Sequence, residues 1–211
     1  MNAPDSSERV LYVFYDIETP QYTKLSDKPN EHVPILVCLQ QLCSKCDNIS
    51  DIEQDCIQCG KRIHSFLDDP VGDMLSYLCE SRTRVENIVA NAHNAKAFVL
   101  HVMINRAILL KCQVKLIMNG MKIMCMRVCE YLLFLDSISF LPFALRTFPV
   151  AFVLTVAKLC YQHYFNTHAN LDYVGRIRYI SYYGVDEMSA IDSFEFLAWY
   201  GVQKVDVFHK R

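Results

Sequence analysis

The sequence lacks an apolar run long enough to cross a membrane as a helix. Such a span needs about 18 or more apolar residues with few charges. The two most apolar stretches, residues 97–118 and 131–157, are each interrupted by charged residues, and the second also by prolines. We therefore expect both stretches to form buried core elements and expect no membrane partner. An apolar signal segment is also lacking, because residues 1–9 are polar and mixed in charge.

The chain also lacks a strong excess of charge of either sign. Its 211 residues carry a formal net charge of −2, and 52% of them are hydrophobic, which is a globular composition with room for one core and a small appendage. The charge is unevenly distributed, since residues 96–178 hold 10 basic and 3 acidic groups, formally +7. A basic segment of this kind suits contact with a phosphate backbone, although a charge excess is more often only a solvated face.

Cysteine is plentiful, and four of the ten cysteines form two Cys-x-x-Cys pairs with nine residues between them. These are Cys43, Cys46, Cys56 and Cys59. Two pairs at this distance can fold back so that four thiolates surround a tetrahedral zinc ion. The alternatives are four free thiols or two local disulfides. A zinc ion closed in by four cysteines has no open coordination position, so its role would be structural. His64 could replace one ligand, but we expect it to lie just outside the site.

The pattern along the chain predicts strands first and then alternating helices and strands, which suits an α/β or α+β sheet domain. The predicted strands cover residues 10–15, 33–42, 87–92, 114–117, 122–126 and 131–136. The predicted helices cover residues 71–80, 95–110, 143–148, 151–156 and 193–200. Pro149 separates the helix at 143–148 from the helix at 151–156. Asn94 is a candidate N-cap, and Asn119-Gly120 is a strong turn signal between two strands.

The first predicted strand ends in two carboxylates, Asp16 and Glu18. Residues two apart on a strand point to the same face, so these side chains are expected to project together. Paired carboxylates hold hard divalent cations such as magnesium, and two such ions can drive phosphodiester hydrolysis. For Asp-x-Glu alone, a strand end turning into solvent is the commoner explanation.

Several segments in collinear order resemble the exonuclease side of the protein-primed family B DNA polymerases, including those of large self-synthesising transposons. The segments are YVFYDIETP, ANAHNAKAF, LDSISFLPFAL, FPVAFVLTVAKLCYQHYFN, and YYGVDEM with FEFLAWYG. Together they run from about Leu11 to Phe208. The resemblance implies a ribonuclease-H-like α/β exonuclease domain and, for the family, DNA replication with 3′–5′ proofreading.

The resemblance also implies roles for individual residues. Asp16 and Glu18 match the acids that bind magnesium or manganese in the first motif. Asn94 and Phe98 match residues of the second motif that contact the single-stranded primer end, and Ser137 matches a stretch that touches single-stranded DNA. Lys158 and Tyr161 match a Lys-x-x-hydrophobic element near the exonuclease metals. Without the resemblance, a helix cap, core residues and a surface lysine explain these positions equally well.

The sequence departs from the family pattern at two places. Val99 stands where the second motif has a metal-binding aspartate, and valine cannot hold a metal or a charge. The third motif, Tyr-x-x-x-Asp, is expected after Trp199 but is not found before Arg211, and neither is a polymerase palm domain. Tyr182 and Asp186 have the right spacing but precede Trp199. The resemblance therefore implies a truncated or decayed copy without polymerase activity.

We thus expect a ribonuclease-H-like domain formed by residues 1–42 and 61–211, with a zinc ribbon inserted at residues 43–60. The expected cofactors are structural zinc and, at an incomplete exonuclease site, magnesium or manganese. The expected partner is single-stranded DNA or a primer terminus, and the resemblance adds a terminal protein as a candidate. Two alternatives to an enzyme are a single-stranded nucleic-acid-binding remnant and a zinc-ribbon interaction module. The cysteine pattern favours an intracellular, reducing location.

Overall fold

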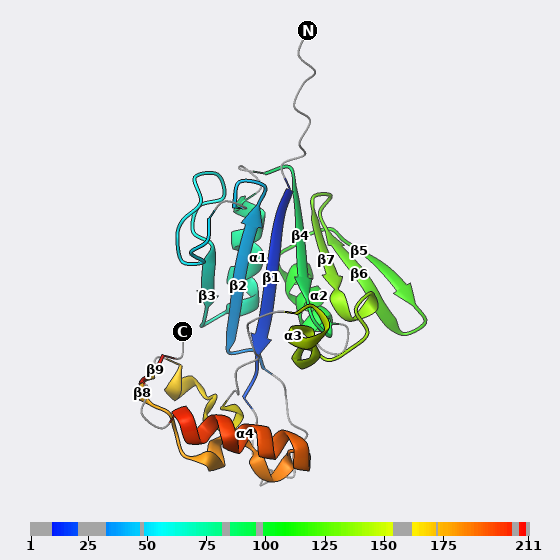
Figure 1. The fold of residues 1–211 in the computed structure, drawn as a ribbon. Helices are drawn as coiled ribbons and strands as arrows, with labels where there is room; N and C mark the ends of the chain where they lie inside the picture. Colours follow the sequence, from blue (N-terminus) through cyan, green and yellow to red (C-terminus); the bar gives the residue numbers. More distant parts are fainter. Residues whose placement is uncertain are drawn as a thin grey trace. The chain divides into compact units, whose positions relative to one another are not determined.

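The computed structural model describes residues 10–20, 33–46, 49–81, 85–95, 99–153, 162–171, 173–203 and 207–209. The chain folds into two compact units (Figure 1). The first unit contains residues 1–17 and 36–147, and the second contains residues 18–35 and 148–211. The segment with the two Cys-x-x-Cys pairs belongs to the first unit. No helix of the described residues is long and apolar enough to cross a membrane.

A mixed seven-stranded sheet dominates the first unit, in the order β3-β2-β1-β4-β7-β6-β5. Its strands are β1 (Val10–Glu18), β2 (Leu36–Cys43), β3 (Ile63–Phe66), β4 (Asn87–Ala92), β5 (Val114–Asn119), β6 (Lys122–Val128) and β7 (Leu132–Asp136). β1, β4 and β7 are parallel, while β2 and β3, and β5 and β6, form antiparallel pairs. The α/β prediction is confirmed to this extent: the sheet is mixed and flanked by helices.

The strands alternate between a buried face and a more exposed face. In β1, Leu11 and Val13 are at most 2% exposed, whereas Tyr12 and Phe14 are 50% and 45% exposed. β4 and β7 run in register with β1, so that Ala90 lies between Val13 and Phe134 on the buried face. The apolar run at residues 10–15 predicted a buried strand, and the structure confirms the strand but buries only one of its faces.

Two helices cover the buried face: α1 (Pro70–Ser81) and α2 (Val99–Leu109) lie on the same side of the sheet (Figure 1). α1 buries Met74, Leu75 and Leu78, and α2 buries Leu100 and Met103. Both helices were predicted from their apolar spacing. The backbone of Asn94 does not suit the predicted N-cap role, because its φ of 64° is left-handed; residues 96–98, which precede the described start of α2, lie outside the described residues. An N-cap residue normally has an extended backbone.

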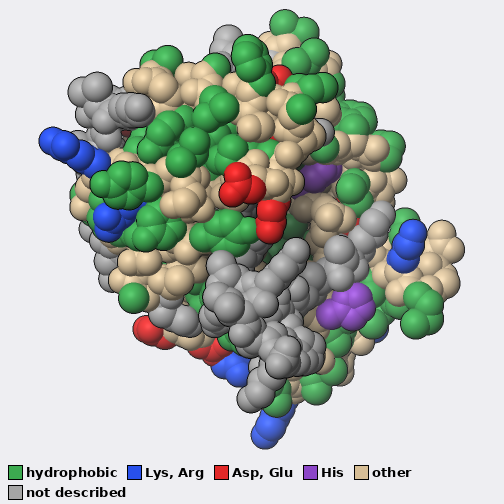
Figure 2. Space-filling view, turned by 90° about the horizontal axis from the view of Figure 1, so that it is seen from below, with side chains coloured by type: hydrophobic (Ala, Val, Ile, Leu, Met, Phe, Trp, Pro, Cys, Tyr) green, Lys and Arg blue, Asp and Glu red, His purple; other side chains and the backbone are tan. Residues whose placement is uncertain are grey.

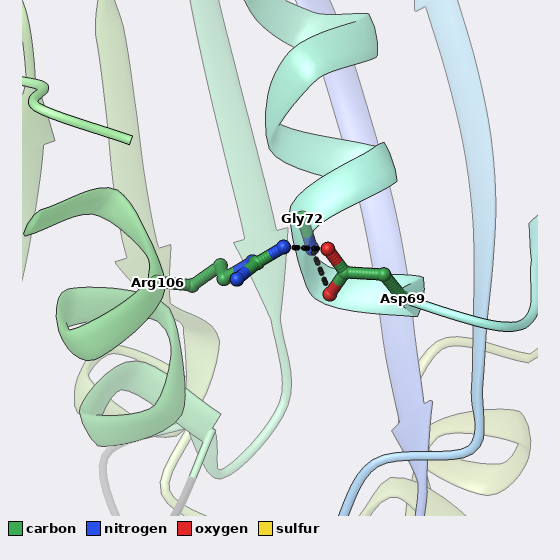
Figure 3. Close-up of polar contacts among 3 residues, drawn as sticks. All are labelled: Asp69, Gly72 and Arg106. Carbon is green, nitrogen blue, oxygen red and sulfur yellow. Dashed lines mark hydrogen bonds and ion pairs between the residues drawn. The ribbon is translucent and has the colours of Figure 1, made fainter. Parts of the chain in front are cut away.

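Asp69 caps α1 and links it to α2 (Figure 3). Its Oδ1 accepts a hydrogen bond from the backbone N–H of Gly72 at 3.4 Å, and its Oδ2 forms an ion pair with Arg106 of α2. A Cβ at position 72 would collide with the Asp69 carboxylate and the Arg106 guanidinium. A larger residue at position 72 would therefore displace these two side chains from their present ion pair.

Replacing Asp69 by alanine is expected to lower the free energy of unfolding by about 1–2 kcal/mol, mainly through loss of the helix cap. The ion pair adds little, because its side chains are 34% and 44% exposed and water screens them. Urea denaturation followed by circular dichroism measures the change. Asp68→Ala is the matched control, since Asp68 is exposed and adjacent. Equal losses in the two variants would contradict the capping role.

The turn between β5 and β6 forms one residue later than the predicted dipeptide, because Asn119 ends β5 and pairs with Lys122, which leaves Gly120 and Met121 as the loop. Gly120 has a φ of +59°, a left-handed conformation that glycine adopts at no steric cost. The strands on either side pair from Val114 with Val128 to Asn119 with Lys122. This hairpin extends the sheet beyond β7 and carries Lys115, Lys122 and Arg127, part of the basic segment.

The second unit contains short elements: α3 (Phe148–Ala151), β8 (Val174–Arg176), β9 (Val207–His209), α4 (Ala190–Gln203) and several 3-10 turns. The described core of this unit is aromatic. Tyr183 and Phe196 are 1% and 2% exposed, with ring centroids 4.9 Å apart, and Trp199 and Tyr200 pack beside them. The opposite face of α4 exposes Ile191, Phe194 and Val202.

Exposed hydrophobic side chains are common on the face of the molecule shown in Figure 2.

The prediction of two helices separated by Pro149 is wrong. A 3-10 turn covers Leu145–Thr147, and α3 contains Pro149 as its second residue. Proline is tolerated there because the first N–H groups of a helix have no partner within it. The predicted final helix at residues 193–200 lies within α4.

Candidate metal centre and the carboxyl edge of the sheet

The four predicted zinc ligands come together in the first unit. Cys43 is the last residue of β2, and Cys46 lies in the turn that follows. Cys56 and Cys59 lie in a second turn, which is closed by two backbone hydrogen bonds between Cys56 and Gly60 of 2.9 and 2.8 Å. Gly60 has a φ of 77°, a conformation in which other residues are strained.

The sulfur atoms have the spacing of a tetrahedral metal site. The Sγ–Sγ distances are 3.9 Å for Cys43–Cys46, 3.7 Å for Cys43–Cys56 and 3.5 Å for Cys46–Cys59. All four sulfur atoms lie within 4.8 Å of one another. Zinc bonded to sulfur at about 2.3 Å in a tetrahedron separates neighbouring sulfurs by about 3.8 Å. The four cysteines could therefore hold a metal ion such as zinc, as their sequence spacing predicted.

The protonation of the thiols depends on the turns that hold them. Burial raises the pKa of Cys43 and also that of Cys59. Burial has the same effect on Cys56, but the backbone N–H groups of Cys59 and Gln58 and the neighbouring thiols outweigh it and lower the pKa of Cys56 to about 7. Cys56 is thus the thiol that most readily becomes the thiolate that a metal requires.

The cysteine segment is fixed to the sheet by buried polar side chains. Gln41 of β2, 1% exposed, donates from Nε2 to the carbonyls of Cys59 and Lys61 at 2.8 and 2.7 Å. Its Oε1 accepts a hydrogen bond from the Tyr77 hydroxyl of α1 at 2.9 Å. Arg62, 5% exposed, donates to the carbonyl of Asp51 at 2.9 Å. The second cysteine pair is thus bonded to β2 through Gln41, which is in turn bonded to α1 through Tyr77.

The centre is closed to solvent. The four cysteines are 3–4% exposed and belong to the same hydrophobic cluster as the side chains beneath the sheet. His64 lies outside the thiol group, with its Nε2 2.9 Å from both the Lys61 carbonyl and the Tyr77 hydroxyl. Burial lowers the pKa of His64. A metal here would have a structural role, because no position is open for a substrate.

A second polar group gathers where the parallel strands β1, β4 and β7 end. β1 ends with Asp16, which is exposed, and Glu18, which is half-buried. Asp136 ends β7 and is 1% exposed; its Oδ1 accepts from the backbone N–H groups of Asn94 at 2.8 Å and Ile138 at 3.1 Å. In open α/β sheets, ligands bind outside the carboxyl ends of the strands.

Ser137 and His93 connect β4 to β7 at this edge. The Ser137 hydroxyl donates to the carbonyl of Ala92 at 3.2 Å and lies 2.9 Å from Nδ1 of His93. The His93 Nε2 donates to the carbonyl of Phe143 at 3.0 Å. Ser137 is 5% exposed, so in this conformation its hydroxyl forms hydrogen bonds within the protein.

Tyr15 lies beneath the same edge. It is 6% exposed, and its ring meets that of Phe134 edge-on at 5.9 Å. Burial raises the pKa of Tyr15, and the negative charges of Asp136 and Asp16 raise it further. The phenol therefore stays neutral at any physiological pH, and negative charge is concentrated at this end of the sheet.

The other predicted site residues fall into two groups. Phe98, Lys158 and Tyr161 lie outside the described residues. Asn94 is described and exposed, and its backbone is tied to Asp136. Val99 begins α2 and is half-buried against the core cluster. Within the part of the chain that the structure describes, the four cysteines form a group of three or more potential metal ligands, and the acids of the carboxyl edge do not.

Three residues of these sites were not predicted from the sequence. Gln41 and Arg62 hold the cysteine segment, and Asp136 ties the ends of β4 and β7 together. The sequence does contain an indication for Gln41, because a polar residue in a mostly apolar strand needs hydrogen-bond partners when it is buried. Comparison with protein-family models finds no match, and no match is found among curated protein sequences.

Proposed function

We propose that the chain is a ribonuclease-H-like, exonuclease-type domain of the kind found in protein-primed family B DNA polymerases. In this proposal it binds single-stranded DNA or a primer terminus and does not itself polymerise or cut DNA. The larger function would be DNA replication with 3′–5′ proofreading. The cysteine centre would stabilise the fold, and the carboxyl edge of the sheet would face the DNA end.

The arrangement of the sheet supports this proposal. A three-stranded meander, β1 to β3, precedes two parallel strands, β4 and β7, that are reached through the α1 and α2 crossovers. The Asp-x-Glu pair ends β1, and Asp136 ends β7, with the parallel strand β4 between them. This order agrees with the collinear motifs, because the first motif falls on β1 and the second falls where β4 ends.

The cysteine centre is compatible with the same proposal. It extends from the end of β2 to the start of β3, at the far side of the sheet from the β5–β6 hairpin. An insertion there leaves the β1–β4–β7 edge unaltered. Its four thiols lie together, and a hydrogen bond from Gln41 of β2 to the Cys59 carbonyl attaches it to the sheet.

The expected result of a binding experiment is sequence-independent binding of short single strands that weakens steeply with salt. The basic segment at residues 96–178 supplies phosphate contacts, which release counterions from the strand. Fluorescence anisotropy of labelled oligo-dT and oligo-dA, each at 50 and 200 mM salt, measures this binding. A matched pair of variants is Lys122→Gln on the β5–β6 hairpin and Lys45→Gln beside the cysteines.

Binding that is absent at low salt, or that does not change with salt, contradicts the proposal. Binding that Lys45→Gln weakens more than Lys122→Gln would point instead to the cysteine segment as an interaction module. Metal content, measured on the same samples, shows whether the first unit is intact.

A further inference from the structure

A hollow of about 360 Å³ lies within the second unit and is separate from both sites described above. Its lining comes from the stretch around β8 and from α4: Tyr173, Arg176, Ile177, Arg178, Tyr179 and Tyr200. The volume is at the low end of small-ligand sites, which range from about 300 to 1,000 Å³. The hollow therefore suits a ligand of mononucleotide size and is too small for a duplex.

Arg178 is held rigidly on aromatic rings. Its guanidinium carbon lies 4.6 Å from the ring centroid of Phe165 and 4.1 Å from that of Tyr173, and these two rings meet edge-on at 5.1 Å. The Tyr200 hydroxyl donates to the Arg178 carbonyl at 3.1 Å, which ties this segment to α4. The stacking fixes the direction in which the guanidinium can donate.

The positive charge of the hollow is not neutralised by described neighbours. The six lining residues include two guanidinium groups and no carboxylate. Among the described residues, no ion pair involves Arg176 or Arg178, and the buried Nε of Arg178 has no hydrogen-bond partner. This Nε is enclosed by the protein, so an anion in the hollow would be held by the charge of the two guanidinium groups and not by the Nε itself.

The aromatic lining provides flat apolar surface beside the charge. The Tyr173 hydroxyl already donates to the Arg176 carbonyl at 2.9 Å and the Arg178 guanidinium covers one face of the Tyr173 ring, so Tyr179 is the lining ring best placed to contact a ligand. Tyr179 is 78% exposed at the rim of the hollow. Guanidinium groups recognise phosphate oxygens, and an exposed aromatic ring stacks with a base.

We propose that this hollow binds a nucleoside phosphate, with the phosphate on Arg176 and Arg178 and the base against Tyr179. The ligand could come from a free nucleotide or from one nucleotide of a single strand. The second source would deepen the proposed function, on which it then rests, by adding a strand contact in the second unit.

Calorimetric titration of the full chain tests this proposal, with dTMP, thymidine and an eight-residue oligo-dT as probes. We expect dTMP to bind and thymidine to bind at least about tenfold more weakly, because a hydrogen bond to a charged group is lost. Tyr179→Ala should weaken dTMP about five- to hundredfold, the range for loss of one stacked base. Arg176→Gln should weaken dTMP about tenfold or more.

Lys45→Gln is the control, because it removes a positive charge from an exposed residue of the first unit that lies outside the basic segment. Tyr179 is largely exposed, so Tyr179→Ala keeps the test valid if an arginine variant misfolds. Equal dTMP binding by all variants, or equal binding of thymidine and dTMP, overturns the proposal. If oligo-dT and dTMP both depend on Arg176 and oligo-dT binds more tightly, the source is a strand; binding of dTMP alone identifies a free nucleotide.

The two proposals fail in different ways. Oligo-dT binding without dTMP binding removes this inference and leaves the proposed function intact. Binding of dTMP without oligo-dT binding removes the proposed function and leaves this inference intact.

Discussion

A variant with Cys43→Ser and Cys56→Ser is expected to lose its bound zinc and most of the stability of the first unit. The two changes remove one thiolate from each Cys-x-x-Cys pair, so only two ligands remain. Structural zinc binds zinc-finger peptides with about 10–16 kcal/mol at pH 7. This is as large as the whole stability of an ordinary domain, about 5–15 kcal/mol.

The effect should spread from the cysteine segment into the sheet. The cysteines are part of the hydrophobic cluster that includes Leu39 of β2 and Leu75 of α1. Gln41 is the connection, since its side chain bonds both the Cys59 carbonyl and the Tyr77 hydroxyl. If the cysteine segment unfolds, this buried amide loses two acceptors, and an unsatisfied buried polar group costs about 1–3 kcal/mol.

Elemental analysis of the purified chain should find about one zinc per chain, and none in the double variant. Thermal unfolding should start at a temperature more than roughly 10 °C lower in the double variant, because about 1 kcal/mol alone shifts the midpoint of a domain of this size by roughly 2–4 °C. Cys125→Ser is the control, because it makes the same chemical change on β6, outside the metal group. Zinc retained in the double variant would contradict the ligand assignment.

The features predicted best from the sequence are those fixed by local chemistry. β1 follows from a dense apolar run, and Asn119-Gly120 locates the β5–β6 turn to within one residue, because a glycine at the first loop position favours a two-residue hairpin. The cysteine cluster follows from ligand spacing alone. Each of these signals lies within about 20 residues of sequence and needs no knowledge of the tertiary structure.

The features that were missed depend on contacts between distant segments. β3 is a four-residue edge strand, IHSF, whose pairing with β2 cannot be recognised from so short a pattern. β8 and β9 pair across more than thirty residues and have three residues each. The hollow in the second unit is likewise formed by Tyr200 of α4 packing on the segment around Arg178, which periodicity does not reveal.

The second large effect concerns DNA cleavage: the chain is expected to release no nucleotides from single-stranded DNA above background, with magnesium or manganese. Hydrolysis by two metals requires enough carboxylates to hold both ions and to orient the attacking water. Loss of one group that positions or stabilises the reacting atoms costs on the order of 10²–10³-fold. Val99 stands where the resemblance places one such group, so a loss of at least this size is expected.

Few carboxylates at the carboxyl edge of the sheet are available as metal ligands. Asp16 and Glu18 are the acids that the resemblance assigns to the metals. Asp136 is nearby on β7, but it is 1% exposed and its Oδ1 already accepts two backbone hydrogen bonds. Val99 begins α2 with an apolar side chain packed against the core. The edge can concentrate negative charge without providing a complete ligand set.

Val99→Asp is therefore expected to strengthen magnesium binding and to leave hydrolysis near background. One added carboxylate supplies charge, but by itself it does not supply the geometry that holds both ions and orients the attacking water. Val99→Asn is the matched control, because it has nearly the same shape without the charge. Calorimetry with magnesium measures the first effect, and release of label from a 3′-labelled single strand in manganese measures the second.

The same assay on the unaltered chain decides whether this account of the edge is correct. If the unaltered chain degrades the strand and Asp16→Ala abolishes the activity, the edge holds a complete site and our interpretation is wrong. The missing ligand would then have to come from elsewhere in the chain, and Asp186, four residues after Tyr182, is the first residue to replace. If Val99→Asp but not Val99→Asn gains cleavage, the valine alone accounts for the inactivity. Persistent inactivity of both, with tighter magnesium binding only in Val99→Asp, is the expected result, because charge at a site is easier to restore than geometry.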